Sequence, residues 1–216
     1  MDIDRFKMLP PVQFITHKAA GISLSESAEK ALKAGVRWIQ FRCKEELPEA
    51  ELWQMAQQVQ QACKEYGALF VIDDRVELAA GLKANGVHLG KHDMPIEQAR
   101  RRLGKDFLIG GTANTLQDML HLARQGANYI GLGPFRFTST KEKLSPLLGL
   151  EGYKRLMTQA RRQGLGIPVY AIGGINSQDA ADLQACGVDG IAVSSALLNA
   201  HEPQAEAAAL AKPFTR

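Results

Sequence analysis

The sequence predicts a single (β/α)8 barrel, a closed ring of eight parallel strands with helices outside it, formed by residues 1–216 as one domain. Short apolar runs, typical of buried strands, alternate along the chain with segments whose apolar residues recur at helical spacing. A glycine that ends the preceding helix introduces several of these runs, as in Gly35-Val36 and Gly67-Ala68. Eight such units in 216 residues fit this TIM-barrel fold near the small end of its size range.

The predicted elements follow one another after a short N-terminal tail, residues 1–10. The first strand begins after Pro10-Pro11, and Ser23 and Ser25 offer N-caps for the first helix. The predicted strands span, in order, residues 12–16, 38–44, 69–73, 86–90, 107–111, 129–133, 169–173 and 190–194. Helices are predicted at about residues 23–35, 48–66, 76–82, 95–103, 115–123, 150–160 and 177–186, with one or two short helices ending near residue 211.

A doubly wound open sheet is the alternative arrangement for alternating strands and helices. Such sheets carry a glycine-rich dinucleotide fingerprint after the first strand. The sequence has no such fingerprint at that place, which favours the closed barrel.

Composition excludes several classes of function. The net charge is only +3 and the basic residues are scattered, so nothing indicates a nucleic-acid partner. No apolar run approaches the roughly 18 residues of a membrane span, and the N-terminus lacks the apolar core of a signal peptide. The cysteines Cys43, Cys63 and Cys186 are odd in number and show no CxxC spacing, so we expect reduced thiols in a cytoplasmic protein. Assembly into a homo-oligomer stays open.

A polar cluster ends the second predicted strand. In barrels of this kind the active site lies at the C-terminal ends of the strands. Alternation puts Gln40, Arg42 and Lys44 on one strand face, opposite an apolar set that suits the helix layer. An amide and two cations directed into the barrel mouth are expensive to bury without an anion. The alternative is internal ion pairing with acids on neighbouring strands.

Carboxylates follow the next two strands. Asp73 and Asp74 end the third strand and Asp93 follows the fourth. Mg²⁺ prefers oxygen ligands and often takes one or two carboxylates plus substrate phosphates and water, so the sequence predicts a Mg²⁺ site here. The alternative is that Asp74 pairs with Arg75 or caps a helix and that Asp93 caps the helix after it. His88, inside a strand, is expected to be a hydrogen-bonded core histidine.

Two further segments have the chemistry of anion sites. A long loop, residues 134–148, carries three hydroxyls and a cation at 138–141. Loops of this length in compact domains are usually functional or disordered, and the stiff and apolar residues of this loop argue against disorder. The alternative is a solvated loop with capping hydroxyls. Closure of this loop over a substrate is plausible from its length. The glycines at 173–174 and the serines at 194–195 end the seventh and eighth strands, where barrels commonly bind phosphate on backbone N–H groups.

The chain resembles the thiamine phosphate synthase family over nearly its whole length. The segments that carry the resemblance are IQFRCK, IDDRVELA, NGVHLGKHDMP, GGTANT, YIGLGPFRFTSTK, LGLEGY, IPVYAIGGI and GVDGIAVSSAL. The resemblance implies an enzyme that joins an aminopyrimidine methyl pyrophosphate to a thiazole phosphate, with or without an extra carboxylate, and releases pyrophosphate. It implies small-molecule substrates and Mg²⁺ as the cofactor.

The resemblance also implies roles for individual residues. The residues implied to hold the pyrimidine pyrophosphate are Gln40, Arg42, Lys44 and Lys141, and the three cations among them would neutralise the charge that develops on the leaving group. Asp74 and Asp93 match the Mg²⁺ ligands. The positions implied around the thiazole phosphate are Thr112, Thr138, Thr140, Gly174, Ser194 and Ser195.

The chain departs from the family pattern at three positions. Asp73 stands in the pyrophosphate site where the family usually has Asn, and it adds negative charge that Lys91, in place of a common Gln, would offset. Cys43 stands where Glu is usual and is expected to face the helix layer. Three rivals remain: a thiazole tautomerase on the same barrel, another sugar-phosphate or indole-type barrel enzyme, and a non-catalytic barrel that binds thiamine precursors.

Overall fold

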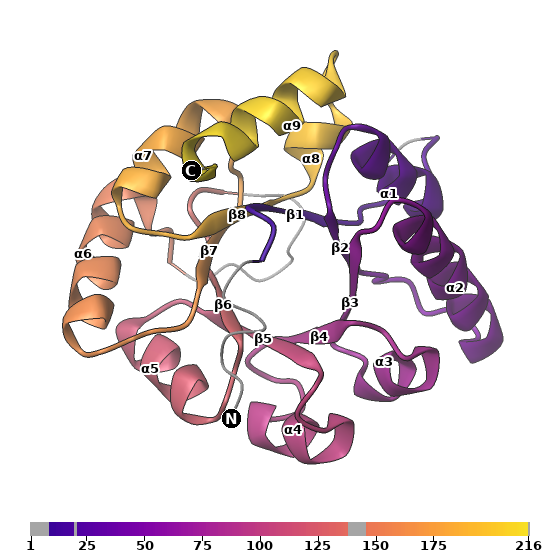
Figure 1. Ribbon diagram of the computed structural model, residues 1–216, viewed down its shortest axis with the longest axis horizontal. Coiled ribbons are helices and arrows are strands. Elements are labelled where there is room, and N and C mark those ends of the chain that lie inside the picture. The colour runs from indigo at the N-terminus through magenta and orange to yellow at the C-terminus, as the bar shows by residue number, and fades with distance from the viewer. Residues whose placement is uncertain (1–8, 20, 138–145, 216) are drawn as a thin grey trace.

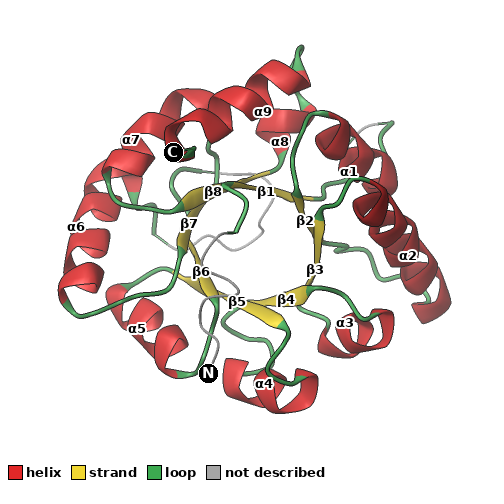
Figure 2. Cartoon of the chain, in the orientation of Figure 1, coloured by secondary structure: helices red, strands yellow, loops and turns green. Residues whose placement is uncertain are grey.

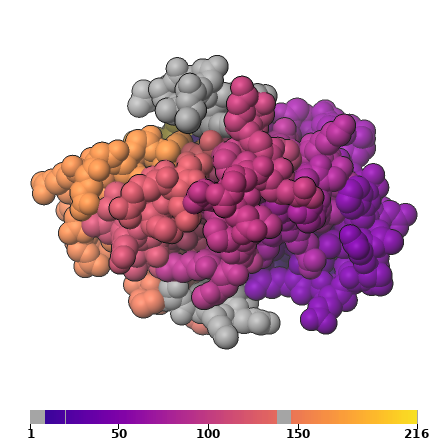
Figure 3. Space-filling model, turned by 90° about the horizontal axis from the view of Figure 1, so that it is seen from below, coloured from indigo at the N-terminus to yellow at the C-terminus, as the bar shows by residue number. Residues whose placement is uncertain are grey.

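The strands form a closed parallel barrel, so the predicted fold is confirmed (Figure 1). The structure is a computed structural model that describes residues 9–19, 21–137 and 146–215. Each strand pairs with the next along the chain, and β1 pairs with β8 to close the ring. Figure 2 shows the ring of strands inside and the helices around it, the arrangement that right-handed βα connections produce. Seen from the side, the molecule is wider than it is thick (Figure 3).

All eight predicted strands are present. They are β1 (Val12–Ile15), β2 (Trp38–Phe41), β3 (Leu69–Asp73), β4 (Gly86–Leu89), β5 (Leu108–Ala113), β6 (Tyr129–Leu132), β7 (Val169–Ile172) and β8 (Gly190–Val193). The helices are α1 (Leu24–Lys33), α2 (Glu49–Glu65), α3 (Val76–Leu82), α4 (Ile96–Leu103), α5 (Leu116–Arg124), α6 (Gly149–Arg162), α7 (Ala180–Ala185), α8 (Ser195–Leu198) and α9 (Pro203–Ala211), with short 3₁₀ turns η2 (Ser177–Asp179) and η3 (Lys212–Phe214).

The end of β2 differs from the prediction, which extended this strand to Lys44. The ladder stops at Phe41 because the next peptide is bonded by a side chain instead of a strand. The N–H of Arg42 donates to Thr16 Oγ1 (2.8 Å), and the same hydroxyl donates to the Arg42 carbonyl (3.1 Å). Residues 42–44 therefore leave the barrel wall at its C-terminal edge.

Local signals in the sequence explain several helix starts. Ser23 caps α1 in a capping box with Glu26, as expected for one of the two predicted caps. Thr115 and Asp118 form the same motif at α5. Buried apolar residues of the helices pack against the outward faces of the strands and form the main core. Among the described residues, no helix is long and apolar enough to cross a membrane.

The barrel interior is aromatic towards the N-terminal ends of the strands. Trp38 lies at its centre, with the rings of Tyr129 and Tyr170 edge-on at 4.8 Å and 4.9 Å. The Tyr170 hydroxyl donates to the carbonyl of Pro10 (3.0 Å), which ties the segment before β1 across the bottom of the barrel. Because side chains fill this half of the barrel, room for a site remains at the C-terminal end.

Candidate active site

A cavity of about 600 Å³ opens at the C-terminal ends of the strands. It gathers the predicted site residues that the structure describes: Gln40, Arg42, Lys44, Asp73, Asp74, Asp93, Thr112, Gly174, Ser194 and Ser195. Three further predicted residues, Thr138, Thr140 and Lys141, lie outside the described residues. The tertiary fold thus brings together residues more than 150 positions apart.

The cationic wall of the cavity comes from β2 and contains an internal ion pair. Arg42 Nε lies 3.2 Å from Asp73 Oδ2, and Gln40 Nε2 donates to Asp73 Oδ1 (2.5 Å). The alternative of internal ion pairing is therefore realised for Arg42. Lys44 is exposed, and no ion pair of its ammonium is found within the described part of the chain. The two cations and the amide face the cavity as the alternation predicted.

The suggestion that Lys91 offsets the charge of Asp73 was wrong. Lys91 Nζ pairs with Asp118 Oδ2 at 2.7 Å. Asp118 also accepts the N–H groups of Asn114 and Thr115, so this carboxylate is part of the start of α5. Cys43 packs partly buried against the core, as the alternation predicted.

Asp74 and Asp93 form a carboxylate pair on the wall next to Asp73. The backbone of Asp74 is left-handed (φ 61°), a conformation that non-glycine residues adopt mostly at functional sites or tight turns. Loss of water in the cavity, the neighbouring charge of Asp73 and a hydrogen bond with Asp93 raise the pKa of Asp74 well above its usual range. A buried carboxyl group beside two others is a place where a cation could be held.

Neither aspartate is a helix cap, the alternative that the sequence left open. Asp93 Oδ2 accepts the N–H of Gly90 at 2.7 Å, whereas α4 begins after Pro95. The residue before α3 is Arg75, and no side chain caps that helix. Within the described ranges, no group of three or more His, Cys, Asp or Glu side chains is arranged for a metal. Only a few protein ligands would therefore coordinate a cation at this wall.

The opposite wall comes from β7 and β8 and carries the features of an anion site. Gly173 and Gly174 both have positive φ values, 100° and 68°, which glycine adopts without strain. Ser194 Oγ is buried and makes no hydrogen bond within the described part of the chain. A buried hydroxyl without a partner is unfavourable, so its position on the cavity wall favours a bound polar ligand.

A buried hydrogen-bond chain supports the floor of the cavity. Gln13 Nε2 donates to the Tyr129 hydroxyl (3.3 Å), which bonds to His88 Nδ1 (3.0 Å), and His88 Nε2 bonds to Thr112 Oγ1 (3.0 Å). The prediction of a hydrogen-bonded core histidine is confirmed. Sequence reasoning missed that His88 also lines the cavity and orients Thr112 there. Strand alternation at 86–89, where His88 falls on the inward face, was the available signal.

Sequence reasoning also missed two polar residues of the loops around the cavity. Asn114 lines the cavity, and its Nδ2 donates to the Gly133 carbonyl across to the next strand. Arg136, which follows β6, forms an ion pair with Asp179 in the loop after β7. Spacing could not have found this pair, because its partners are 43 residues apart and Arg136 lies in a loop.

The chain is similar to known proteins over most of its length. The family described as Thiamine monophosphate synthase matches residues 12–197. A thiamine-phosphate synthase of Bacteroides fragilis is 52% identical over 196 residues, which cover 90% of this chain and 95% of that protein. One of Bacteroides thetaiotaomicron is 50% identical over 195 residues, 90% of this chain and 93% of that one.

Solved structures extend the similarity to the fold. A thiamine phosphate pyrophosphorylase from Pyrococcus furiosus superposes with a TM-score of 0.81 at 35% identity, with 95% of each chain covered. A 3-hexulose-6-phosphate synthase superposes with a TM-score of 0.67 at only 17% identity, which shows the barrel fold alone. The chain therefore belongs to the thiamine monophosphate synthase family and is a transferase enzyme.

Proposed function

We propose that the chain forms thiamine phosphate from 4-amino-2-methyl-5-hydroxymethylpyrimidine pyrophosphate and 4-methyl-5-(2-phosphoethyl)thiazole, or the carboxylate form of that thiazole, and releases pyrophosphate. The observation that carries the proposal is the division of one cavity into two polar walls. Cations and carboxylates from β2–β4 form one wall, and a glycine turn and serines after β7 and β8 form the other. Two such walls are needed to bind one substrate that carries a pyrophosphate and another that carries a phosphate monoester.

The cationic wall would bind and release the pyrophosphate. The bond between the pyrimidine methylene and the pyrophosphate oxygen would break with its electron pair on the oxygen. Arg42, Lys44 and Lys141 would neutralise the charge that develops there, which is usually the largest contribution to catalysis in such sites. Arg42 would have to exchange Asp73 for the substrate, at least in part, because the two are paired at 3.2 Å.

The carboxylate wall fits Mg²⁺. Its donors are oxygen atoms, and burial together with the neighbouring Asp73 and Asp93 raises the pKa of Asp74, an effect that a bound cation would oppose. Asp74 and Asp93 would hold the ion. When bound, Mg²⁺ supplies positive charge that stabilises the pyrophosphate as it leaves. The small number of protein ligands leaves coordination positions for substrate oxygens and water.

The second wall would hold the thiazole by its phosphate, through Gly174, Ser194 and Ser195, with Thr112, Thr138 and Thr140 beside it. The thiazole nitrogen would then donate its electron pair to the short-lived pyrimidine methylene cation. This step needs close approach more than a protein base or nucleophile.

A coupling assay tests the proposal. Purified protein, both substrates and Mg²⁺ are incubated, and thiamine phosphate is read by fluorescence after oxidation. We expect product that depends on Mg²⁺ and is lost in Lys141→Ala but kept in Lys64→Ala, a control on the exposed face of α2. No product, together with calorimetric binding of the thiazole phosphate, would contradict the proposal and favour a tautomerase or a binding protein.

Magnesium should stabilise the folded protein through Asp74 and Asp93. At about ten times its Kd a ligand that binds only the folded state adds about 1.4 kcal/mol, which corresponds to roughly 3–5 °C in the Tm of a chain of this length. We expect that shift in wild type by calorimetry. Asp74→Asn should remove the shift while it keeps the left-handed backbone, which Asn tolerates. An equal shift in the variant would rule out Asp74 as a ligand.

Replacement of the unusual Asp73 should be tolerated. Asp73→Asn can keep the hydrogen bond from Gln40 and removes the negative charge that competes with pyrophosphate for Arg42. These effects oppose the looser positioning of Arg42, so we expect activity within about tenfold of wild type, or about 1.4 kcal/mol of barrier. Steady-state kinetics measure this, and a much larger loss with an unchanged Tm would give Asp73 a specific catalytic role.

A further inference from the structure

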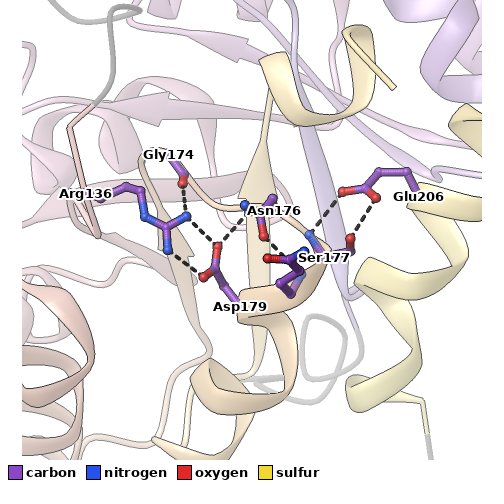
Figure 4. Close-up of polar contacts among 7 residues, drawn as sticks. Arg136, Gly174, Asn176, Ser177, Asp179 and Glu206 are labelled. Carbon is purple, nitrogen blue, oxygen red and sulfur yellow. Dashed lines mark hydrogen bonds and ion pairs between the residues drawn. The ribbon is translucent and has the colours of Figure 1, made fainter. Parts of the chain in front are cut away.

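Two side chains from outside the cavity hold the loop after β7, residues 173–179. Arg136 reaches it from the segment after β6, and Glu206 reaches it from α9 (Figure 4). The carboxylate of Glu206 accepts the N–H (3.0 Å) and the hydroxyl (2.7 Å) of Ser177. Neither Arg136 nor Glu206 lines the cavity, whereas residues 173–175 do. The loop thus has an outer side that is anchored and an inner side that faces the cavity.

Arg136 bonds to two successive peptide carbonyls of this loop. Its backbone N–H donates to the Gly173 carbonyl (3.0 Å), and its Nη1 donates to the Gly174 carbonyl (2.8 Å). The guanidinium is itself fixed by Asp179, with Nη1 2.8 Å from Oδ2 and Nη2 2.6 Å from Oδ1. The same carboxylate accepts the N–H of Asn176 (2.9 Å), so Asp179 joins the arginine to the start of η2.

The direction of these carbonyls determines the direction of two N–H groups. In a planar trans peptide the N–H points opposite to the carbonyl. The N–H groups of Gly174 and Ile175 therefore point away from Arg136, the side on which the cavity lies. Within the described residues, neither N–H donates a hydrogen bond to the protein. Successive backbone N–H groups on a turn with positive φ form a concavity that binds anions.

The close approach of Arg136 also restricts what can stand at Gly174. A Cβ there would lie 2.5 Å from Arg136 Cγ and 2.8 Å from the Phe137 carbonyl oxygen. The arginine side chain thus fills the outer face of the turn. This packing and the two hydrogen bonds to the carbonyls together fix the orientation of the turn.

We propose that Arg136 is a positioning residue for the phosphate of the thiazole substrate. It does not contact the phosphate, but it directs the N–H groups of Gly174 and Ile175 into the cavity. The inference rests on the proposed function for the identity of the ligand, a phosphate monoester. Asp179 is its partner, because it holds the guanidinium in the plane from which Nη1 reaches the Gly174 carbonyl.

The chain offers a matched control at the other face of the barrel. Arg161 Nη1 donates to the carbonyls of Leu165 (2.8 Å) and Ile167 (3.1 Å), and its Nη2 pairs with Asp189 (2.6 Å). This arginine also holds a loop and an aspartate, but before β7, away from the cavity. Loss of either arginine should change stability to a similar extent, since both ion pairs are partly exposed.

The experiment compares Arg136→Met, Asp179→Asn and Arg161→Met with wild type in the full chain. In the coupling assay, Arg136→Met should raise KM for the thiazole phosphate roughly tenfold or more, the loss expected when hydrogen bonds to a charged group are misaligned. KM for the pyrimidine pyrophosphate and kcat should stay within about twofold to threefold. Asp179→Asn should raise the KM for the thiazole phosphate less than Arg136→Met does. Arg136→Lys should have a KM between those of wild type and Arg136→Met, and Arg161→Met should leave this KM unchanged.

A second measurement separates this inference from the proposed function. Amide NMR signals of Gly174 and Ile175 are followed while inorganic phosphate is added. We expect shifts of both amides in wild type and in Arg161→Met. In Arg136→Met the shift of Ile175 should be lost, because its peptide loses the side-chain bond to the Gly174 carbonyl, whereas the backbone N–H that bonds to the Gly173 carbonyl is kept. Coupling activity with equal phosphate responses and equal KM values in all variants would overturn the role of Arg136 alone. Absence of coupling, with the phosphate response still dependent on Arg136, would overturn only the proposed function. Absence of both coupling and any phosphate response in wild type would overturn both.

Discussion

Arg42→Met should lower kcat about 100- to 1,000-fold, the loss typical for removal of one group that stabilises charge in the transition state. Arg42 lies beside the carboxylate wall, with its Nε 3.2 Å from Asp73 Oδ2. Its removal takes positive charge from the pyrophosphate site and leaves the charge of Asp73 without this partner. Both changes disfavour an anionic leaving group, so the effect should fall on kcat more than on the KM of the thiazole phosphate.

The control for this substitution lies at the other end of the same strand. Arg37 precedes β2, donates to the carbonyls of Leu32 (3.0 Å) and Val36 (2.9 Å), and is remote from the cavity. Arg37→Met should leave kcat within about twofold. In the double variant Arg42→Met/Asp73→Asn, part of the activity should return, because the carboxylate of Asp73 then no longer repels the pyrophosphate. If Arg42→Met keeps more than about a tenth of wild-type activity, pyrophosphate release does not depend on this cation.

Trp38→Ala should lower the free energy of unfolding by about 3–5 kcal/mol, the range for loss of a large aromatic side chain from a core. Trp38 is fully buried and packs edge-on against Tyr129 and Tyr170 in the lower half of the barrel. The closed ring of strands limits collapse around the cavity that remains. Since whole domains are stable by about 5–15 kcal/mol, this one change would remove a large share of the total. Urea unfolding followed by circular dichroism measures it.

Trp38→Phe is the matched variant. The indole N–H of Trp38 is buried and has no hydrogen-bond partner within the described residues, so its removal breaks no such bond there. Phenylalanine keeps an aromatic ring between the two tyrosines, and we expect less than half the loss seen with alanine. Equal losses in the two variants would show that a phenyl ring contributes nothing at this place and that this layer needs the indole itself.

The sequence by itself determined the barrel and most of its elements. Apolar runs of strand length, helix-ending glycines such as Gly35 and caps such as Ser23 are local signals, and they depend on backbone geometry within a few residues. The alternation at residues 40–44 correctly predicted which side chains reach the cavity, although the strand itself stops at Phe41. The location of the site followed from the topology, since parallel strands present all their C-terminal ends at one face.

Only the tertiary structure decided which charges pair across the strands. The sequence suggested that Lys91 offsets the charge of Asp73, but the register of β2 and β3 puts Asp73 beside Arg42, and Lys91 pairs with Asp118. The hydrogen bonds of His88 and the ion pair between Arg136 and Asp179 likewise join parts of the protein that are distant in sequence. Such pairs depend on distances of a few ångströms between loops and strands that local periodicity does not encode, whereas the elements themselves depend on neighbours along the sequence.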